Sequence, residues 1–227
     1  KPRVVVVTGA GISAESGIKT FRAADGLWEE HRVEDVATPE GFARDPALVQ
    51  AFYNARRRQL QSPEIAPNAA HLALARLEDL LGDHFLLVTQ NIDNLHQMAG
   101  SKKVLELHGS VYRNYCMKCH RFYDFAHMKA STGVPRCECG GIIKPDVVLY
   151  EEGLDNQTIN EAVKAISEAQ VLIIGGTSLA VYPAAGLIDY FRGEHLVVIN
   201  KSPTPRDRYA DLLIQEPIGQ VFSQIHC

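Results

Sequence analysis

The sequence predicts an α/β protein, in which a parallel sheet covered by helices is interrupted by a small inserted zinc-binding domain. Short apolar runs end abruptly at glycine or polar residues, helical patterns lie between these runs, and two close pairs of cysteines stand near the middle of the chain. Alternation of strands and helices favours a parallel sheet with both faces covered. The carboxyl ends of its strands would then line one crevice.

The first expected strand, residues 4–8 (VVVVT), leads directly into the turn Gly9, Ala10 and Gly11. A glycine turn between a buried strand and a helix lets backbone amides approach a pyrophosphate, so this segment predicts a Rossmann-like unit that could bind a dinucleotide. The next glycine is Gly17, and the spacing of the dehydrogenase fingerprint is therefore not met. A tight strand-to-helix turn without a ligand is the alternative.

Residues 20–28 show no periodicity and contain large side chains, so we expect a loop that could close over a ligand. Residues 39–60 follow with a helical pattern. Tyr53 and Arg56 would share one face of that helix, and a hydroxyl beside a guanidinium would suit a carboxylate. A tyrosine at the edge of the core beside a surface arginine is the alternative. The basic run at 56–58 is expected to be a solvated helix surface.

The second strand, residues 86–89 (LLVT), follows a helix that begins at about Pro67 and ends at Gly82. This strand stops at four polar side chains, which are Gln90, Asn91, Asp93 and Asn94. Their amides and carboxylate could fix a ribose or an amide group by complementary hydrogen bonds. The alternative is a helix N-cap, in which Asp93 or Asn94 accepts from backbone amides.

A third strand, residues 104–107, would deliver His108 and Gly109 to the same side of the sheet. Histidine is the side chain best able to gain and lose a proton near neutral pH. A lone histidine beside a glycine is more often a structural turn residue. Its chemical role therefore depends on its lying next to the other strand ends.

The strongest local signal consists of two close pairs of cysteines: Cys116, Cys119, Cys137 and Cys139. Four thiolates in a reduced protein suit tetrahedral zinc, which can hold together a module too small to have its own core. The second pair is Cys-x-Cys where Cys-x-x-Cys is usual. Because all four ligands are cysteine, no position stays open for a substrate, and the zinc is expected to be structural.

After the cysteines the chain returns to a strand at residues 144–150, so we expect the zinc segment to be an insertion in a larger fold. A helix at about 156–169 leads to a strand at 171–174, which ends in a second glycine turn. Another helix, beginning after Pro183, leads to a strand at 196–199. The expected domains are a Rossmann-like unit at 1–108 and 145–227, with a helical insertion at about 38–66, and a zinc module at 109–144.

The 227 residues, with 46% hydrophobic and 22% charged side chains, are typical of a soluble globular protein. No apolar run approaches the roughly 20 residues that a membrane span needs. No signal peptide is visible, and because the sequence begins at Lys1 without a methionine, this says little about targeting. The net charge of −4 argues against nucleic acid as a direct partner. Clustered cysteines without a disulfide framework indicate a reducing compartment, so we expect a cytoplasmic protein.

In their order along the chain these motifs resemble the sirtuins, and the resemblance covers nearly the whole sequence. It rests on the four cysteines and on residues 9–13, 21–22, 89–93, 107–109, 144–146, 176–178 and 182–183. The resemblance implies an NAD-dependent protein lysine deacylase. It also implies a cleft between a Rossmann-like domain and a small zinc domain, in which NAD and an acylated lysine peptide bind.

By this resemblance the catalytic residues are His108, as general base, and Asn91. The acyl oxygen attacks the anomeric carbon of the nicotinamide riboside, nicotinamide leaves, and His108 deprotonates a ribose hydroxyl, so that O-acyl-ADP-ribose forms. The residues assigned to NAD are Gly9, Ala10, Gly11, Ser13, Phe21, Arg22, Gln90, Asn91, Ile92, Asp93, Gly176, Thr177, Ser178, Asn200 and Lys201. The peptide would lie as an added strand, and the residues assigned to it and its acyl group are Ala24, Tyr53, Arg56, Val147, Leu149, Tyr150 and Val181.

Sirtuins that remove succinyl or malonyl groups carry a Tyr-x-x-Arg pair like Tyr53 and Arg56, with an alanine that enlarges the acyl pocket. We therefore expect desuccinylase and demalonylase activity besides deacetylation. Thr20 stands where many sirtuins have aspartate, and Glu151 replaces a glycine, which is expected to alter peptide docking. Residues up to about His96 resemble one bacterial branch and the remainder another, which suggests the hypothesis of a recombined chain.

Two other classes of protein are alternatives. A sirtuin-like protein ADP-ribosyltransferase would use the same NAD site, although the pair Tyr53 and Arg56 favours deacylation. A non-enzymatic zinc-ribbon binding module would need the cysteines but not the glycine turns.

Overall fold

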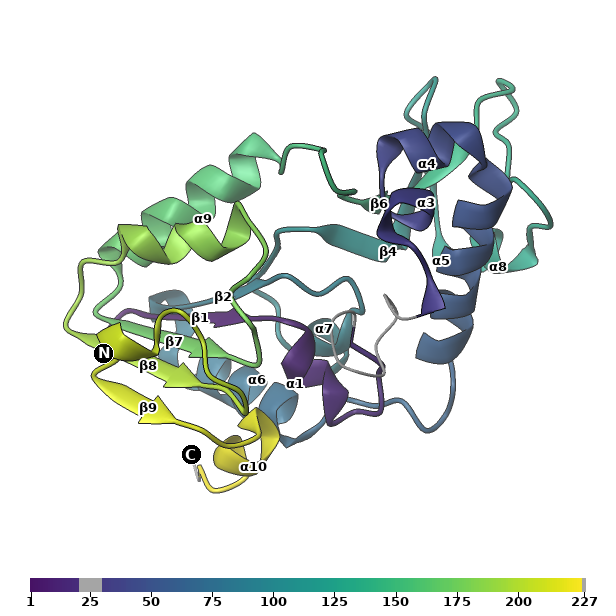
Figure 1. Ribbon diagram of the computed structural model, residues 1–227. Coiled ribbons are helices and arrows are strands. Elements are labelled where there is room, and N and C mark those ends of the chain that lie inside the picture. The colour runs from purple at the N-terminus through teal and green to yellow at the C-terminus, as the bar shows by residue number, and fades with distance from the viewer. Residues whose placement is uncertain (21–29, 226–227) are drawn as a thin grey trace.

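The computed structural model describes residues 1–20 and 30–225, and a six-stranded sheet forms the larger of its two units (Figure 1). Every neighbouring pair of these strands is parallel, which confirms the predicted fold class. In their order across the sheet the strands are β3 (Val104–Glu106), β2 (Phe85–Thr89), β1 (Val4–Thr8), β7 (Val171–Gly175), β8 (His195–Ile199) and β9 (Leu212–Ile214).

The direction in which strands are added to the sheet reverses at β1. The chain runs outward from β1 through β2 and β3, then returns to β7 on the other side of β1 and continues through β8 to β9. The carboxyl ends of β1 and β7 therefore stand side by side, with Thr8 paired to Gly175. A switch of this kind leaves a crevice between neighbouring strand-end loops, which is where such sheets bind ligands.

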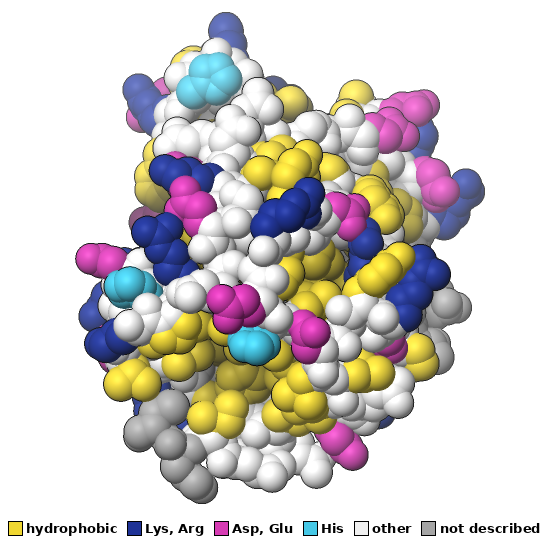
Figure 2. Space-filling view, turned by 90° about the vertical axis from the view of Figure 1, so that its left-hand side faces the viewer, with side chains coloured by type: hydrophobic (Ala, Val, Ile, Leu, Met, Phe, Trp, Pro, Cys, Tyr) yellow, Lys and Arg dark blue, Asp and Glu magenta, His cyan; other side chains and the backbone are white. Residues whose placement is uncertain are grey.

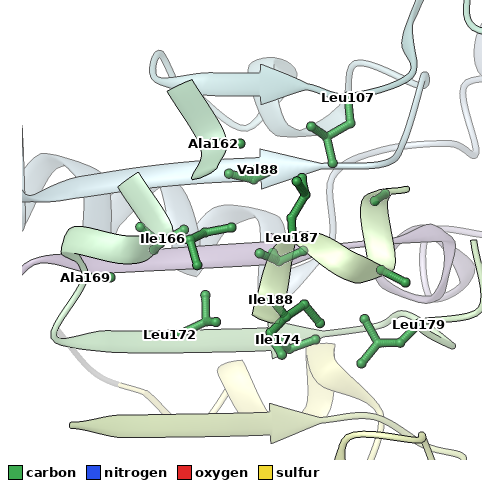
Figure 3. Packing of buried hydrophobic residues seen from close by; sticks show 14 of the residues in the cluster. Val88, Leu107, Ala162, Ile166, Ala169, Leu172, Ile174, Leu179, Leu187 and Ile188 are labelled. Atoms are coloured by element: carbon green, nitrogen blue, oxygen red, sulfur yellow. The ribbon is translucent and has the colours of Figure 1, made fainter. Parts of the chain in front are cut away.

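Helices cover both faces of this sheet because the side chains of its central strand alternate between them. Val5 and Val7 join a hydrophobic cluster with α9 and η2 (Figure 3), whereas Val4 and Val6 join a second cluster with α1, α6 and α10. The helices of this unit are α1 (Ala10–Ala14), α6 (Ala69–Leu81), η1 (Gly82–His84), α7 (Leu95–Met98), α9 (Asn156–Glu168), η2 (Ala184–Tyr190), η3 (Asp207–Tyr209) and α10 (Ile218–Phe222).

The smaller unit lies beyond the carboxyl ends of the large sheet (Figure 1). Three antiparallel strands in the order β5-β4-β6 form its sheet, and a hydrophobic cluster joins that sheet to the preceding helices. Its elements are α3 (Val33–Val36), α4 (Pro39–Arg44), α5 (Pro46–Leu60), β4 (Gly109–Cys116), β5 (Phe122–Tyr123), α8 (Phe125–Ala130) and β6 (Ile143–Val147).

Three expectations about the elements are corrected by the structure. The helical pattern at 39–60 is two helices, because Pro46 starts a new helix whose N-cap is the Asp45 side chain. The strand expected at 144–150 ends at Val147 and pairs with β4, so the smaller sheet extends past the expected end of the zinc module. The helix after Pro183 is of the 3₁₀ type.

Figure 2 shows how charged and hydrophobic side chains of the described residues are distributed over one face of the molecule. That face carries lysine and arginine side chains interspersed with aspartate and glutamate, without a continuous basic area of the kind that binds phosphate backbones. Within residues 1–20 and 30–225, every helix falls short of the length and apolar character that a membrane crossing requires.

Candidate active site

A cavity of about 480 Å³ opens between the two units, at the carboxyl ends of β1, β2, β7 and β8. Residues of the predicted site that line it are Ala10, Gly11, Tyr53, Gln90, Asn91, Ile92, His108, Val147, Leu149, Tyr150, Gly176, Thr177, Ser178, Val181, Asn200 and Lys201. The glycine turns, the polar strand end and the histidine thus meet, because parallel strands present their carboxyl ends at one edge. Phe21, Arg22 and Ala24 lie outside the described residues.

Gly9 and Gly11 allow the loops after β1 and β7 to touch. The Gly11 N–H donates a hydrogen bond of 2.7 Å to the Gly176 carbonyl oxygen, and a Cβ at Gly11 would stand only 2.7 Å from that oxygen. A Cβ at Gly9 would stand 2.7 Å from the Thr177 Cβ. Close approach of these two loops therefore requires both glycines. Their predicted contact with a pyrophosphate stays a prediction.

The Asn91 side chain is held by a buried network behind the cavity wall. Its Nδ2 donates to the Gly9 carbonyl oxygen and to Ser13 Oγ, each at 3.1 Å. Ser13 Oγ in turn donates to Asp93 Oδ2 at 2.6 Å, and Asp93 Oδ1 accepts from the Leu95 N–H at 3.0 Å. The alternative is thus partly right, because Asp93 accepts from the first amide of α7, although the N-cap residue is Asn94 and its side chain makes no capping hydrogen bond. The network fixes the orientation of the Asn91 amide at the cavity wall.

Ser13 and Asp93 do not line the large cavity, although the sequence assigned them to NAD. They line a much smaller cavity behind it, together with Arg56. Ala10, Asn91 and Ile92 line both cavities. Ser13 and Asp93 are thus connected to the large cavity by hydrogen bonds that lead to Asn91.

Sequence reasoning missed a layer of buried polar groups under the site. Thr8 and Thr89 are paired strand-end residues whose hydroxyls lie 2.9 Å apart. Thr8 Oγ1 also lies 3.0 Å from His96 Nε2, and Thr89 Oγ1 accepts from the Asn91 N–H at 3.1 Å. Burial, with a smaller effect of His71, lowers the pKa of His96 to about 3, so its imidazole is neutral at pH 7. Two neighbouring strands that both end in threonine were the available signal.

The His108 imidazole stands half-buried at the cavity wall with one nitrogen already engaged. Its Nδ1 lies 2.9 Å from the Gln90 carbonyl oxygen, which can only accept, so Nδ1 carries the proton. In the neutral ring Nε2 is then the unprotonated nitrogen. The Gln90 side chain donates to Thr177 Oγ1 at 3.1 Å, which ties the histidine's partner to the loop after β7.

His108 occupies the joint at which the chain passes from the large sheet into the small one. Arg113 spans this joint: its Nη1 lies 2.6 Å from Glu106 Oε2 at the end of β3, and its Nε lies 2.8 Å from Asp146 Oδ2 in β6. Gly109, which follows the histidine, has a φ of +76°, and a Cβ there would stand 1.9 Å from the Asp146 carbonyl oxygen. Glycine is required at this point.

Replacing Gly109 with alanine is expected to destabilise the fold by roughly 1–3 kcal/mol more than the same change at Gly133. Both glycines have positive φ, +76° and +61°, but a Cβ at Gly133 meets nothing within 4 Å. The difference between the two variants therefore isolates the clash with Asp146. Urea unfolding of both proteins measures it, and equal losses of stability would contradict the close approach.

The predicted acyl-recognition pair is divided between the two cavities. Tyr53 is buried and lines the large cavity, and burial raises the pKa of its hydroxyl. Arg56 is 6% exposed and lines the small cavity beside Asp93. Its Nη1 donates to the Lys19 carbonyl oxygen at 3.1 Å and to Gln59 Oε1 at 2.8 Å. Burial lowers the pKa of Arg56, and the Asp93 carboxylate opposes that shift.

The expectation that the basic run at 56–58 is a solvated surface is wrong for two of its three residues. Arg57, like Arg56, is buried, and only Arg58 is exposed. The Arg57 guanidinium donates to Asn114 Oδ1 at 2.6 Å, which ties α5 to β4. Long arginine side chains can cross from a helix surface into an adjoining unit, and the helical pattern alone could not reveal that unit.

The four cysteine side chains converge on one point in the small unit. All four Sγ atoms lie within 4.8 Å of one another, and the separations are 3.4 Å for Cys116 and Cys139 and 3.5 Å for Cys119 and Cys137. Tetrahedral zinc with Zn–S bonds of about 2.3 Å needs sulfur atoms about 3.8 Å apart. The cluster therefore fits a Cys₄ zinc ion, including its Cys-x-Cys pair.

Known proteins that are similar to this chain belong to a family of NAD-dependent enzymes. A profile of the Sir2 family matches residues 9–183. A Clostridium perfringens protein named NAD-dependent protein deacetylase is 55% identical over 98% of this chain and 92% of its own length. An Escherichia coli K12 protein named NAD-dependent protein deacylase is 57% identical over 90% of this chain and 74% of its own length.

Solved structures give the same result. The crystal structure of a Sir2 homolog–NAD complex has a TM-score of 0.88 and 39% identity, and the match covers 97% of this chain and 86% of that one. A Sir2 complex with a deacetylated p53 peptide and 3'-O-acetyl ADP-ribose has a TM-score of 0.85 and 35% identity, covering 96% and 90%. The protein therefore belongs to the Sir2 family, and the sequence-based assignment to the sirtuins is confirmed.

Proposed function

We propose that this protein is an NAD-dependent protein lysine deacylase, which releases nicotinamide and produces O-acyl-ADP-ribose. The observation that carries the proposal is the placement of His108, fixed by the Gln90 carbonyl, in the cavity between the two glycine-turn loops. Family membership and the names of the two bacterial relatives supply the reaction class. Its partners are acylated lysine peptides, and its thiolate-rich metal site suits the reducing cytoplasm.

NAD, when bound, supplies the ribose carbon that takes up the acyl oxygen as nicotinamide leaves. The loops holding Ala10, Gly11 and Ser178 would carry its phosphates, and Asn200 would lie nearer the adenosine. Asn91, oriented by Ser13, would position the ribose and the carboxamide. Contacts of this kind would put the sugar within the cavity that His108 also lines.

The proton transfer falls to the imidazole. Because the Nδ1 proton of His108 is directed at the Gln90 carbonyl oxygen, Nε2 is the ring nitrogen that would take the proton of a ribose hydroxyl. The Gln90 backbone that carries this carbonyl is itself held by a hydrogen bond of 3.0 Å from its N–H to the Thr8 carbonyl oxygen. The fold thus favours the tautomer of His108 that carries its proton on Nδ1.

The peptide would bind along the segment after β6. The hydrogen bonds already made by this segment limit which of its backbone groups could pair with a peptide. The amide N–H groups of Val148, Leu149 and Tyr150 already donate to the His108 carbonyl, the Glu152 carboxylate and the Ala37 carbonyl. The Val148 carbonyl oxygen accepts no hydrogen bond from the described residues. A peptide strand would therefore pair here chiefly by donating its own amides, and such pairing gives affinity with little sequence selectivity.

The test is mass spectrometry of acetylated and succinylated peptides incubated with NAD. Deacylation yields a peptide with free lysine together with O-acyl-ADP-ribose. A peptide or protein that gains ADP-ribose instead would identify an ADP-ribosyltransferase, and no change in any substrate would leave only a binding module. Either of these outcomes contradicts the proposal.

We further propose that the enzyme removes succinyl and malonyl groups, through Tyr53 in the large cavity and Arg56 behind it. Changing Arg56 to methionine is expected to lower turnover of succinyl-lysine about 10- to 100-fold relative to acetyl-lysine, as for the loss of a charge-assisted hydrogen bond. Steady-state kinetics with matched peptides measures the ratio.

The matched control is Arg58→Met, which removes the same charge from the exposed face of the same helix. That variant should leave the succinyl-to-acetyl ratio unchanged. If Arg56→Met reduces both activities equally, Arg56 supports the fold of the site and does not recognise the acyl group.

A further inference from the structure

Glu151 stands at the rim of the cavity, next to the segment along which the peptide would bind. It follows Tyr150, lines the cavity and is exposed. Its backbone has a φ of +71°, a region that residues with a side chain rarely adopt. Glycine would adopt this conformation without strain. The chain therefore keeps a carboxylate at a position where a side chain is unfavourable, a pattern that occurs at functional sites.

Glu151 and its neighbour Glu152 differ in whether their carboxylates are paired with other groups of the protein. Glu152 Oε2 accepts from the Leu149 N–H at 2.8 Å and lies 3.2 Å from Lys144 Nζ, so its charge is neutralised within the protein. Glu151 has no hydrogen-bond or ion-pair partner among the described residues. One uncompensated negative charge thus remains at this edge of the cavity.

The two lysines that the structure describes near the site do not compensate that charge. Lys144 is committed to Glu152 and to the Val147 carbonyl oxygen. Lys201 lines the cavity from the end of β8, where the phosphates of NAD would lie, and makes no ion pair with Glu151. Within residues 1–20 and 30–225 no cation is paired with Glu151, so a cation carried by the substrate would find this carboxylate unpaired by those residues.

We propose that Glu151 makes the enzyme prefer acylated lysines that have an arginine or a lysine close by in the sequence. The inference rests on the proposed deacylase function and names the substrate class of that same cleft. In an extended peptide, side chains flanking the acyl-lysine lie along the rim while the acyl chain enters the cavity. Backbone pairing selects little, so a rim charge would provide most of the selectivity.

The test uses acetyl-lysine peptides of one sequence, with arginine, alanine or glutamate placed in turn at each of the two positions on either side of the lysine. We expect kcat/KM to be about two- to fivefold higher for arginine than for alanine at one or more positions, as for an exposed ion pair. The preference should fade at high salt. Glu151→Gln should abolish it, and so should Glu151→Gly, which also removes the backbone strain.

Glu216→Gln is the matched control, because Glu216 is exposed, carries the same charge and does not line the cavity. It should keep the arginine preference. The proposal is overturned if the parent shows no preference at any position, or if Glu151→Gln retains it. Affinities of the same peptides, measured by fluorescence anisotropy, test the arginine preference independently of turnover. Absence of turnover with every peptide would instead refute the deacylase function.

Discussion

Replacing His108 with alanine is expected to lower kcat for acetyl-lysine removal by about 10²- to 10⁴-fold, the usual contribution of a general base. The imidazole is the titratable ring at the cavity wall whose tautomer is fixed by a backbone carbonyl, with Nδ1 2.9 Å from Gln90 O. Removing it takes away the proton acceptor and leaves the glycine-turn loops intact. Calorimetric affinity for NAD should therefore change far less than kcat.

His195→Ala serves as the control for this variant. His195 begins β8 at the amino-terminal end of that strand, away from the cavity at the carboxyl ends, and its side chain is 63% exposed. Its replacement should change neither kcat nor NAD affinity. Loss of no more than a few-fold in kcat for His108→Ala, in a protein that still binds NAD, would exclude the histidine as the base.

Replacing Cys137 with serine is expected to release the zinc, unfold the small sheet around it and abolish deacylation. The cysteine cluster carries most of this region's packing, since its hydrophobic group contains only Cys116, Met128, Cys137 and Ile143 as buried members. A structural zinc contributes its binding energy directly to folding. Because β6 runs from this cluster to the cavity wall at Val147, disorder would reach the peptide site.

Metal analysis, thermal unfolding and turnover together measure this effect. Strong chelators should reproduce it in the parent protein, and added zinc should reverse the chelation. Cys227→Ser, which leaves all four clustered thiols in place, is the control and should retain the metal. A Cys137→Ser protein that keeps both zinc and full activity would contradict a structural role.

The large sheet and the meeting of its strand ends were predictable from the sequence because each depends on local pattern. Apolar β-branched runs ending in glycine or polar residues identify buried parallel strands and the edge they share. That reasoning placed Gly11, Gln90, His108 and Ser178 at one cavity, as the structure does. The cysteine spacing was equally informative, because four thiols within a short segment have few other uses.

What the sequence could not predict depends on contacts between distant segments. The strand at the end of the zinc segment joins the small sheet because it pairs with β4, and a strand pattern does not name its partner. The buried Arg57 guanidinium is satisfied in part by β4, where the Val111 carbonyl and the Asn114 side chain accept from it. Ser13 and Asp93 lie behind the wall of the cavity because Asn91 intervenes, and spacing along the chain carries no information on such depth.

Arg113 makes ion pairs on both sides of the segment that holds His108, and these pairs tie the large sheet to the small one. Glu106 belongs to the large sheet and Asp146 to the small one, and His108 lies in the chain between β3 and β4, where the two sheets are connected. Because the His108 ring is hydrogen-bonded to the Gln90 carbonyl oxygen, at the end of β2 in the large sheet, it would stay with that sheet if the small unit moved. A substrate that draws the two units together would then narrow the cleft without turning the imidazole.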